Sequence, residues 1–159
     1  MSQFYCREDE LRKLNRRYEN GKFECIVIYG RRRVGKTALI NEFCKDKPTV
    51  FLSALNTTGK ENLEALSKAI MSFERPDMES APQFTSYDAA LDELTALSKE
   101  KRIVFVIDEY PYFAKAKPAI SAKLQHIIDH KWTDSKMFLI LCGSSMSFME
   151  SQVLGILAP

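Results

Sequence analysis

The feature that most constrains the fold is an apolar run followed at once by a glycine-rich, basic segment. Residues 24–29 are ECIVIY, and residues 30–37 are GRRRVGKT. A continuous apolar run with a β-branched centre is typical of a strand that is buried on both faces. Apolar residues recur at helical spacing over 36–45, directly after the basic segment. The sequence therefore predicts a strand, a tight turn and a helix in direct succession.

Strand and helix patterns alternate along the rest of the chain. Strands are predicted at 24–29, 49–55, 102–108 and 136–143, and helices at 8–19, 36–45, 60–74, 86–99 and 118–131. A loop is expected over 75–86, which contains two prolines and shows no periodicity. This alternation indicates βαβ units. We therefore expect an α/β fold in three layers, with a mainly parallel sheet of at least four strands and helices on both faces.

Composition excludes several classes of protein. The 159 residues suffice for one domain, and the formal net charge of +2 is too small to indicate nucleic-acid binding by itself. No apolar stretch approaches the ~18 residues that a membrane span needs, and the charged N-terminus is unlike a signal peptide. The cysteines lack metal-type or C-x-x-C spacing and are expected to be reduced, mostly as core residues; they are Cys6, Cys25, Cys44 and Cys142. A cytoplasmic protein is the expectation.

The segment GRRRVGKT matches the phosphate-binding pattern G-x-x-x-x-G-K-[ST] in the context that gives the pattern meaning, between a strand and a helix. Glycines at both ends allow consecutive N–H groups to point into one concavity at a helix N-terminus, which favours a bound anion. Lys36 would reach the β- and γ-phosphates, and the Thr37 hydroxyl would ligate Mg²⁺. The predicted nucleotide-binding residues here are Gly30, Arg31, Arg32, Arg33, Val34, Gly35, Lys36, Thr37 and Ala38.

Only the lysine of this loop is required by phosphate chemistry, so the three arginines need a separate account. Arg31, Arg32 and Arg33 form the one concentrated basic patch of the sequence. One interpretation is a solvated cationic surface. The other is a surface that meets acidic groups of a partner or a nucleic-acid backbone. The sequence leaves both open.

A triphosphate site also needs a metal-orienting acid, and IVFVIDEY at 103–110 supplies one at the end of another strand. Asp108 is expected to hold Mg²⁺ through water. Glu109 is placed to polarise an attacking water, as a general base does. This pair favours ATP hydrolysis over a kinase or a G protein. The alternative is that the two acids merely cap a strand end.

The last predicted strand ends in CGSS, and one of its two serines is a candidate to bond the γ-phosphate or the attacking water. The sequence does not decide between Ser144 and Ser145, and a Gly-Ser-Ser turn is also common in ordinary loops. His126 and His130 are four residues apart, but no third metal ligand lies nearby in the sequence. The aromatic cluster YPYF at 110–113 is interpreted as packing rather than base stacking.

Four blocks of the sequence together resemble one known family. They are FYCREDEL at the N-terminus, YGRRRVGKTALINEF, VIDEYPYF, and CGSSMSFME with the VLG that follows. These resemble the archaeal-type predicted ATPases of the AAA+/STAND group of P-loop proteins, which also occur in bacteria. The resemblance implies that the strands at 102–108 and 136–143 lie between the strand at 49–55 and the one at 24–29. It also implies that Phe4, Tyr5, Arg7 and Glu8 belong to a motif near the adenine.

The resemblance also bears on domain organisation. In the family, the ATPase core is usually followed by a helical lid and a winged-helix region, and a fifth strand covers the free edge of the phosphate-loop strand. We therefore expect residues 1–159 to be a single ATPase core that is truncated at its C-terminus. The alternative is a short natural protein that dimerises across the exposed sheet edge, since a bare apolar edge strand is a pairing hazard.

The leading functional hypothesis is a module that binds and hydrolyses Mg²⁺-ATP and acts as a nucleotide switch. Its expected cofactors are ATP and Mg²⁺, with ADP as the product that it also binds. No cationic finger is identifiable in the sequence, so hydrolysis is expected to be slow. The alternatives are a nucleotide-binding scaffold or DNA-associated module with little turnover and, less favoured, a small-molecule kinase. A DNA or protein partner would act through the C-terminal domains of the family, and no membrane partner is expected.

Overall fold

The computed structural model describes residues 8–30, 35–77, 83–144 and 146–153. Its sheet has four parallel strands in the order β1-β4-β3-β2. The strands are β1 (Glu24–Tyr29), β2 (Thr49–Ser53), β3 (Ile103–Asp108) and β4 (Met137–Gly143). The two later strands lie between the two earlier ones, which confirms the strand order that the family resemblance implied.

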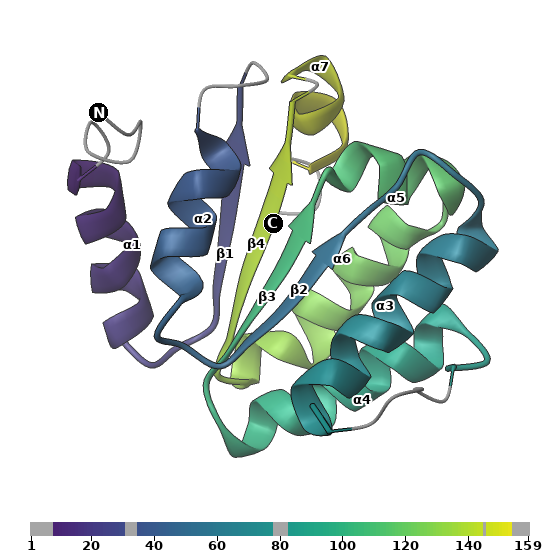
Figure 1. The fold of residues 1–159 in the computed structure, drawn as a ribbon, viewed down its shortest axis with the longest axis horizontal. Coiled ribbons are helices and arrows are strands. Elements are labelled where there is room, and N and C mark those ends of the chain that lie inside the picture. The colour runs from purple at the N-terminus through teal and green to yellow at the C-terminus, as the bar shows by residue number, and fades with distance from the viewer. Residues whose placement is uncertain (1–7, 31–34, 78–82, 145, 154–159) are drawn as a thin grey trace.

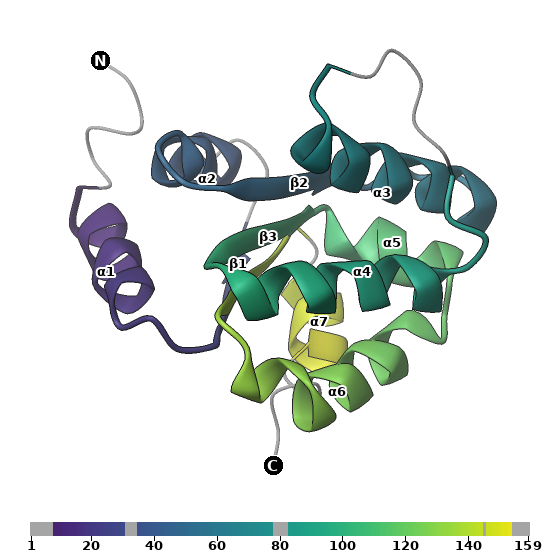
Figure 2. The same ribbon diagram turned by 90° about the horizontal axis from the view of Figure 1, so that it is seen from below.

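Helices cover both faces of the sheet (Figures 1 and 2). One face is covered by α1 (Glu8–Glu19) and α2 (Lys36–Cys44). The other is covered by α3 (Gly59–Glu74), α4 (Tyr87–Glu100), α5 (Tyr110–Ala116) and α6 (Ile120–His130). Shorter turns follow at η2 (Trp132–Asp134), α7 (Met146–Phe148) and η3 (Met149–Val153). The three-layer α/β architecture predicted from the sequence is confirmed.

Two apolar clusters hold the layers together, one on each face of the sheet. Alternate residues of β3 and β4 feed the two clusters, as the period of a strand requires. Apolar residues at helical spacing are buried in these clusters, including Leu39, Ile40 and Phe43 of α2 and Leu63, Leu66 and Ile70 of α3. Burial on both faces explains why β3 and β4 are almost uniformly apolar.

The first strand departs from its prediction. Residues 24–29 were expected to form a strand buried on both faces, but β1 is only half-buried, and Tyr29 is 39% exposed. The reason is position: within the described residues β1 pairs with β4 alone, so its other edge is open. An apolar run does not reveal how many neighbours its strand has.

Several element boundaries also differ from the prediction. The second strand ends at Ser53 rather than residue 55, because the Asn62 side chain takes both the N–H and the C=O of Leu55 out of the ladder, each at 3.0 Å. Helix α6 begins at Ile120 rather than at residue 118. Helix α5 was not predicted, because its seven residues are too short for a periodic signal.

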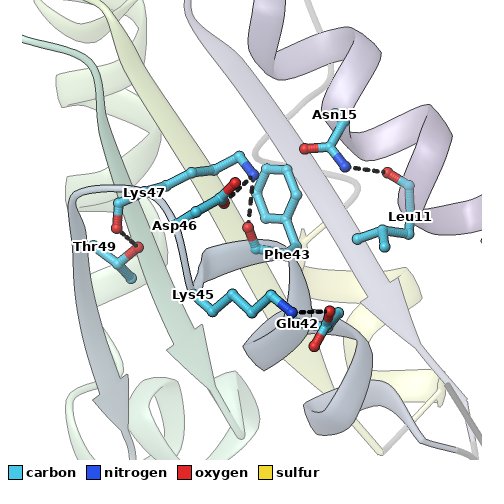
Figure 3. A network of polar contacts seen from close by, with 8 residues as sticks. All are labelled: Leu11, Asn15, Glu42, Phe43, Lys45, Asp46, Lys47 and Thr49. Atoms are coloured by element: carbon cyan, nitrogen blue, oxygen red, sulfur yellow. Dashed lines mark hydrogen bonds and ion pairs between the residues drawn. The ribbon is translucent and has the colours of Figure 1, made fainter.

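The C-terminal end of α2 is fixed by a lysine whose side chain is only 8% exposed (Figure 3). The Lys47 ammonium donates to the C=O of Phe43 at 2.7 Å and to Asp46 Oδ1 at 2.9 Å. It also lies 4.2 Å from the centre of the Phe43 ring, a cation–π contact. One of the carbonyls left without a partner at a helix end is thereby satisfied. This anchors α2 at the end opposite to its first residue, Lys36.

Candidate functional site

The carboxyl ends of three strands meet at one edge of the sheet (Figure 1). Gly30 follows β1, Asp108 ends β3 and Gly143 ends β4. The register places Tyr29 opposite Gly143, so the phosphate loop begins beside the CGSS segment. This is the edge at which open parallel sheets bind their ligands. Residues from three separate parts of the sequence are thus brought together, as the sequence predicted.

The described ends of the phosphate loop have the conformations that only glycine adopts readily. Gly30 has φ 152° and Gly35 has φ 84°. Gly35 is the residue before α2, and a glycine has no side chain that could cap the helix. The N–H groups of the first turn and the helix dipole therefore favour an anion there. Lys36 is 7% exposed, and its ammonium donates to the C=O of Gly30 at 3.0 Å.

A hydroxyl and a carboxylate from distant parts of the chain face each other at this edge. Thr37 Oγ1 donates to Asp108 Oδ2 at 3.1 Å, although the two residues are 71 positions apart. Both are hard oxygen donors of the type that Mg²⁺ prefers. Magnesium is usually held by one or two such protein groups together with waters and substrate phosphates. The donor set therefore fits a magnesium ion bound with a nucleotide.

The Asp108 carboxylate is oriented through its second oxygen as well. The backbone N–H of Glu109 donates to Asp108 Oδ1 at 3.0 Å. Next to it lies Cys142, whose thiol pKa is raised to about 12 by burial first and then by the charge of Asp108 and a hydrogen bond with it. The thiol thus stays protonated beside the carboxylate. Sequence reasoning treated Cys142 as a core residue and missed this contact, which depends on the pairing of β3 with β4.

Glu109 has an unusual backbone. With φ 58° and ψ 47° it is the one non-glycine residue of the described segments with a positive φ. Residues other than glycine rarely adopt this conformation, and those that do are often found at functional sites. The Ser144 hydroxyl lies 3.5 Å from Glu109 Oε1, at the limit of a hydrogen bond. The predicted general base and one of the two predicted serines are therefore neighbours.

A cavity of about 340 Å³ lies along β1. Residues from α1, β1 and α2 line it, among them Arg17, Tyr29 and Lys36. Because Lys36 forms part of its wall, the cavity adjoins the phosphate loop.

The remaining predicted site residues divide into two groups. Arg31, Arg32, Arg33, Val34, Phe4, Tyr5, Arg7 and Ser145 lie outside the described residues. Ala38 lies exposed in the first turn of α2, and Glu8 begins α1. The structure therefore places one candidate serine, Ser144, and does not compare it with Ser145.

The sequence contains two weaker candidate features, a pair of histidines and an aromatic cluster. The His126 and His130 rings lie 4.3 Å apart on α6, and no group of three His, Cys, Asp or Glu side chains suited to a metal occurs among the described residues. Tyr110 and Phe113 are fully buried in the core, which confirms packing as the role of these aromatic residues. Among all the residues that the structure describes, every helix is too short or too polar to cross a membrane.

Comparisons with known proteins agree with this fold. An uncharacterized protein of Methanocaldococcus jannaschii is 33% identical over 156 residues, which cover 98% of this chain and 33% of that protein. The solved Walker-type ATPase of Pyrococcus abyssi has a TM-score of 0.65 at 22% identity, over 93% of this chain and 47% of that one. The Aeropyrum pernix ORC1 protein, solved in complex with DNA, has a TM-score of 0.68 at 18% identity, over 94% of this chain and 42% of that one.

The chain thus spans about a third of the curated relative and less than half of each solved structure. A model of the ATPase domain found predominantly in Archaea matches residues 4–155, nearly the whole sequence. This family implies nucleotide binding. The match, together with the phosphate loop and the strand order, shows that the chain belongs to this family of archaeal ATPase domains.

Proposed function

We propose that this chain binds Mg²⁺-ATP, hydrolyses it, and uses the two nucleotide states as a switch. The observation that carries the proposal is the meeting of Lys36, Thr37 and Asp108 at one sheet edge, with Glu109 beside them. Each group comes from the end of a strand or the start of a helix. Such rigid placement suits phosphoryl transfer, which depends on positioning and charge rather than on covalent chemistry by the protein.

Binding of the triphosphate would begin at the phosphate loop. The proposed contacts come from residues 30–38, through the N–H groups at the start of α2 and the Lys36 ammonium. In the described structure this ammonium donates to the C=O of Gly30, a weaker partner than a phosphate oxygen. The nucleoside would extend into the cavity beside β1. Phe4, Tyr5 and Arg7, of the N-terminal motif, are the proposed contacts of the adenine.

A magnesium ion would be held by Thr37 and Asp108, where it would neutralise charge on the phosphates. In the hydrolytic step, Glu109 accepts a proton from a water whose oxygen attacks the γ-phosphorus. The bond from that phosphorus to the bridging oxygen breaks, and ADP and phosphate leave. Ser144 or Ser145 would contact the γ-phosphate or the attacking water, and loss of that contact after hydrolysis would relax the site.

Partners belong to the same proposal. DNA is one candidate, since the structurally similar ORC1 protein was solved in complex with DNA, and Arg31, Arg32 and Arg33 would supply phosphate contacts. A protein partner is another. Among the described residues β1 pairs with β4 alone, so its other edge would also allow two copies to pair as a homodimer. A scaffold that holds nucleotide without turnover is the main alternative to a hydrolase.

The test is calorimetric titration of ATP and ADP, with Mg²⁺, into the chain and into Lys36→Ala. Loss of a charged contact to phosphate is expected to lower affinity by about tenfold or more. Lys45→Ala is the matched control, because Lys45 is an exposed lysine just after the same helix, paired with Glu42. A folded wild-type chain that binds neither nucleotide, or that binds both as well after Lys36→Ala, contradicts the proposal.

Turnover is tested separately with Glu109→Gln. This change keeps the size of the side chain but removes the proton acceptor. ATP affinity is expected to be retained while phosphate release falls by roughly a hundredfold. Equal turnover in the wild type and the variant would remove Glu109 from the mechanism. Nucleotide binding without any turnover in the wild type would support the scaffold instead.

A further inference from the structure

Gly143 packs against the start of helix α5 more closely than any other residue could. A Cβ added at this position would lie 2.7 Å from Pro111 Cδ and 3.0 Å from Pro111 Cγ. Ordinary contact begins at 3.4 Å, so a methyl group would be at least 0.7 Å too close. The proline ring therefore occupies the space that a side chain on the last residue of β4 would need.

The same Cβ would also lie 2.9 Å from Met149 Sδ. This second contact is different in kind. A methionine side chain has three rotatable bonds and adapts to a neighbour at small cost. The proline ring is fixed to the backbone, so relieving its contact requires the beginning of α5 to move. The rigid contact is therefore the one that limits residue 143 to glycine.

Both partners in the contact are one or two residues from the proposed catalytic groups. Gly143 precedes Ser144, and Pro111 is the second residue after Glu109. Glu109 is held at φ 58° where β3 passes into α5, with its C=O accepting from the N–H of Tyr112 at 3.0 Å. A shift of the first turn of α5 would therefore also move the Glu109 backbone. That movement would change the 3.5 Å distance between Glu109 Oε1 and the Ser144 hydroxyl.

We propose that Gly143 is a positioning residue. Because it has no side chain, the Pro111 ring can pack against it, and this packing sets the distance between the Glu109 carboxylate and the Ser144 hydroxyl. The inference rests on the proposed function, because its consequence is a rate of ATP hydrolysis. It adds a determinant of that rate that touches neither nucleotide nor metal. The contact lies on β4, beside the strand that leads into the phosphate loop, and the rate of hydrolysis is the property through which it is tested.

The test is a pair of substitutions on the full chain. Gly143→Ala is expected to lower the rate of ATP hydrolysis by about tenfold to a hundredfold, as a displacement of about 1 Å in a catalytic group does. Pro111→Ala removes the two clashing ring carbons. Pro111 lies in the first turn of α5, where backbone N–H groups have no partner within the helix, so alanine is tolerated. The double variant is expected to recover most of the lost rate.

Gly21→Ala is the control for a general loss of stability. Gly21 has φ 74°, so alanine is strained there, but no atom lies within 4 Å of the added Cβ, and the site is at the other end of the sheet. It is expected to lower stability and to leave turnover of the folded protein unchanged. A Gly143→Ala variant that hydrolyses ATP like the wild type, or a double variant no faster than Gly143→Ala, overturns the inference.

A second measurement separates this inference from the proposed function. Amide hydrogen exchange over 109–113 is expected to be faster in Gly143→Ala than in the wild type, and to slow again in the double variant. Absence of hydrolysis by the wild type would defeat the proposed function, yet this exchange pattern would still show the steric contact. Unchanged exchange in Gly143→Ala would overturn the inference whatever the wild-type activity. If Gly143→Ala alone does not fold, a folded double variant supports the contact, and an unfolded one contradicts it.

Discussion

Backbone groups orient the side chains of the candidate site. Lys36 donates to a carbonyl, and the Asp108 carboxylate accepts from an N–H. Backbone groups at strand ends and helix starts cannot reorient freely, so they fix these side chains before any ligand arrives. Preorganisation of this kind is what electrostatic stabilisation of a transition state requires.

Cys142 gives a pH-dependent prediction at the same scale. An unfolded thiol ionises near its ordinary pKa of 9.0, whereas burial first, and then Asp108, raise the pKa of Cys142 to about 12 in the folded chain. Between those values the unfolded state loses a proton that the folded state keeps. The free energy of unfolding is therefore expected to fall as the pH rises, by up to about 1.4 kcal/mol per pH unit for this thiol.

Urea denaturation at pH 8, 9 and 10 tests this, with Cys142→Ala as the comparison. The variant keeps the other ionisable groups, including the Cys25 and Cys44 thiols, whose pKa values burial also raises. Its stability should therefore fall less steeply with pH than that of the wild type. Parallel curves for the two proteins would show that the Cys142 thiol does not contribute.

At the scale of elements, α1 is attached to the sheet by one arginine at the end opposite the candidate site. Arg102 Nε donates to the C=O of Tyr18 at 3.0 Å, and its Nη1 donates to the C=O of Lys136 at 2.9 Å. The same guanidinium bonds the carbonyls of Arg17 and Lys22 and lies over the Tyr18 ring, 5.0 Å from its centre. It thereby joins the end of α1, the turn into β1 and the starts of β3 and β4.

Arg102→Ala is expected to destabilise the fold by roughly 2 kcal/mol or more, because several carbonyls lose a charged donor at once. Arg12→Ala is the control: Arg12 pairs with Asp9 on the exposed face of α1, 66% exposed, and such pairs contribute about 0–1 kcal/mol. Urea denaturation measures both. ATP affinity should survive in folded Arg102→Ala, and equal stability losses in the two variants would contradict the role given to Arg102.

At the scale of the whole molecule, the two faces of the sheet carry separate apolar clusters that share β3 and β4. The single tryptophan, Trp132, is fully buried in the cluster opposite α2, where its indole N–H donates to Thr95 Oγ1 at 2.7 Å. The phosphate loop leads into α2, on the other face. Trp132 fluorescence therefore reports on the nucleotide site only if both faces unfold together.

We expect them to do so. Mg²⁺-ATP at a hundred times its Kd should raise the free energy of unfolding by about 2.7 kcal/mol, seen equally by Trp132 fluorescence and by far-ultraviolet circular dichroism. Lys36→Ala should lose this shift. A fluorescence transition that nucleotide leaves in place, beside a dichroism transition that it moves, would show that the two faces unfold independently.

The first strand, the helix after it and the two glycines that flank residues 31–34 could all be predicted from the sequence. So could the two acids at the end of β3. These features depend on local constraints: periodicity, glycine torsions and the residue types that phosphate and magnesium require. The strand order came from the family resemblance rather than from any local pattern. Helix α5 was missed because its signal is short and aromatic.

The sequence by itself thus determined the alternation of strands and helices, the class of fold and the residue types at the carboxyl edge of the sheet. Only the tertiary structure decided that β1 lies at an edge, that Thr37 faces Asp108, that Cys142 lies against that carboxylate, and that Gly143 makes room for Pro111. The physical reason is range. A local pattern acts through the chain over a few residues, whereas each of these contacts joins strands and helices through space, and its geometry exists only when all of them have packed.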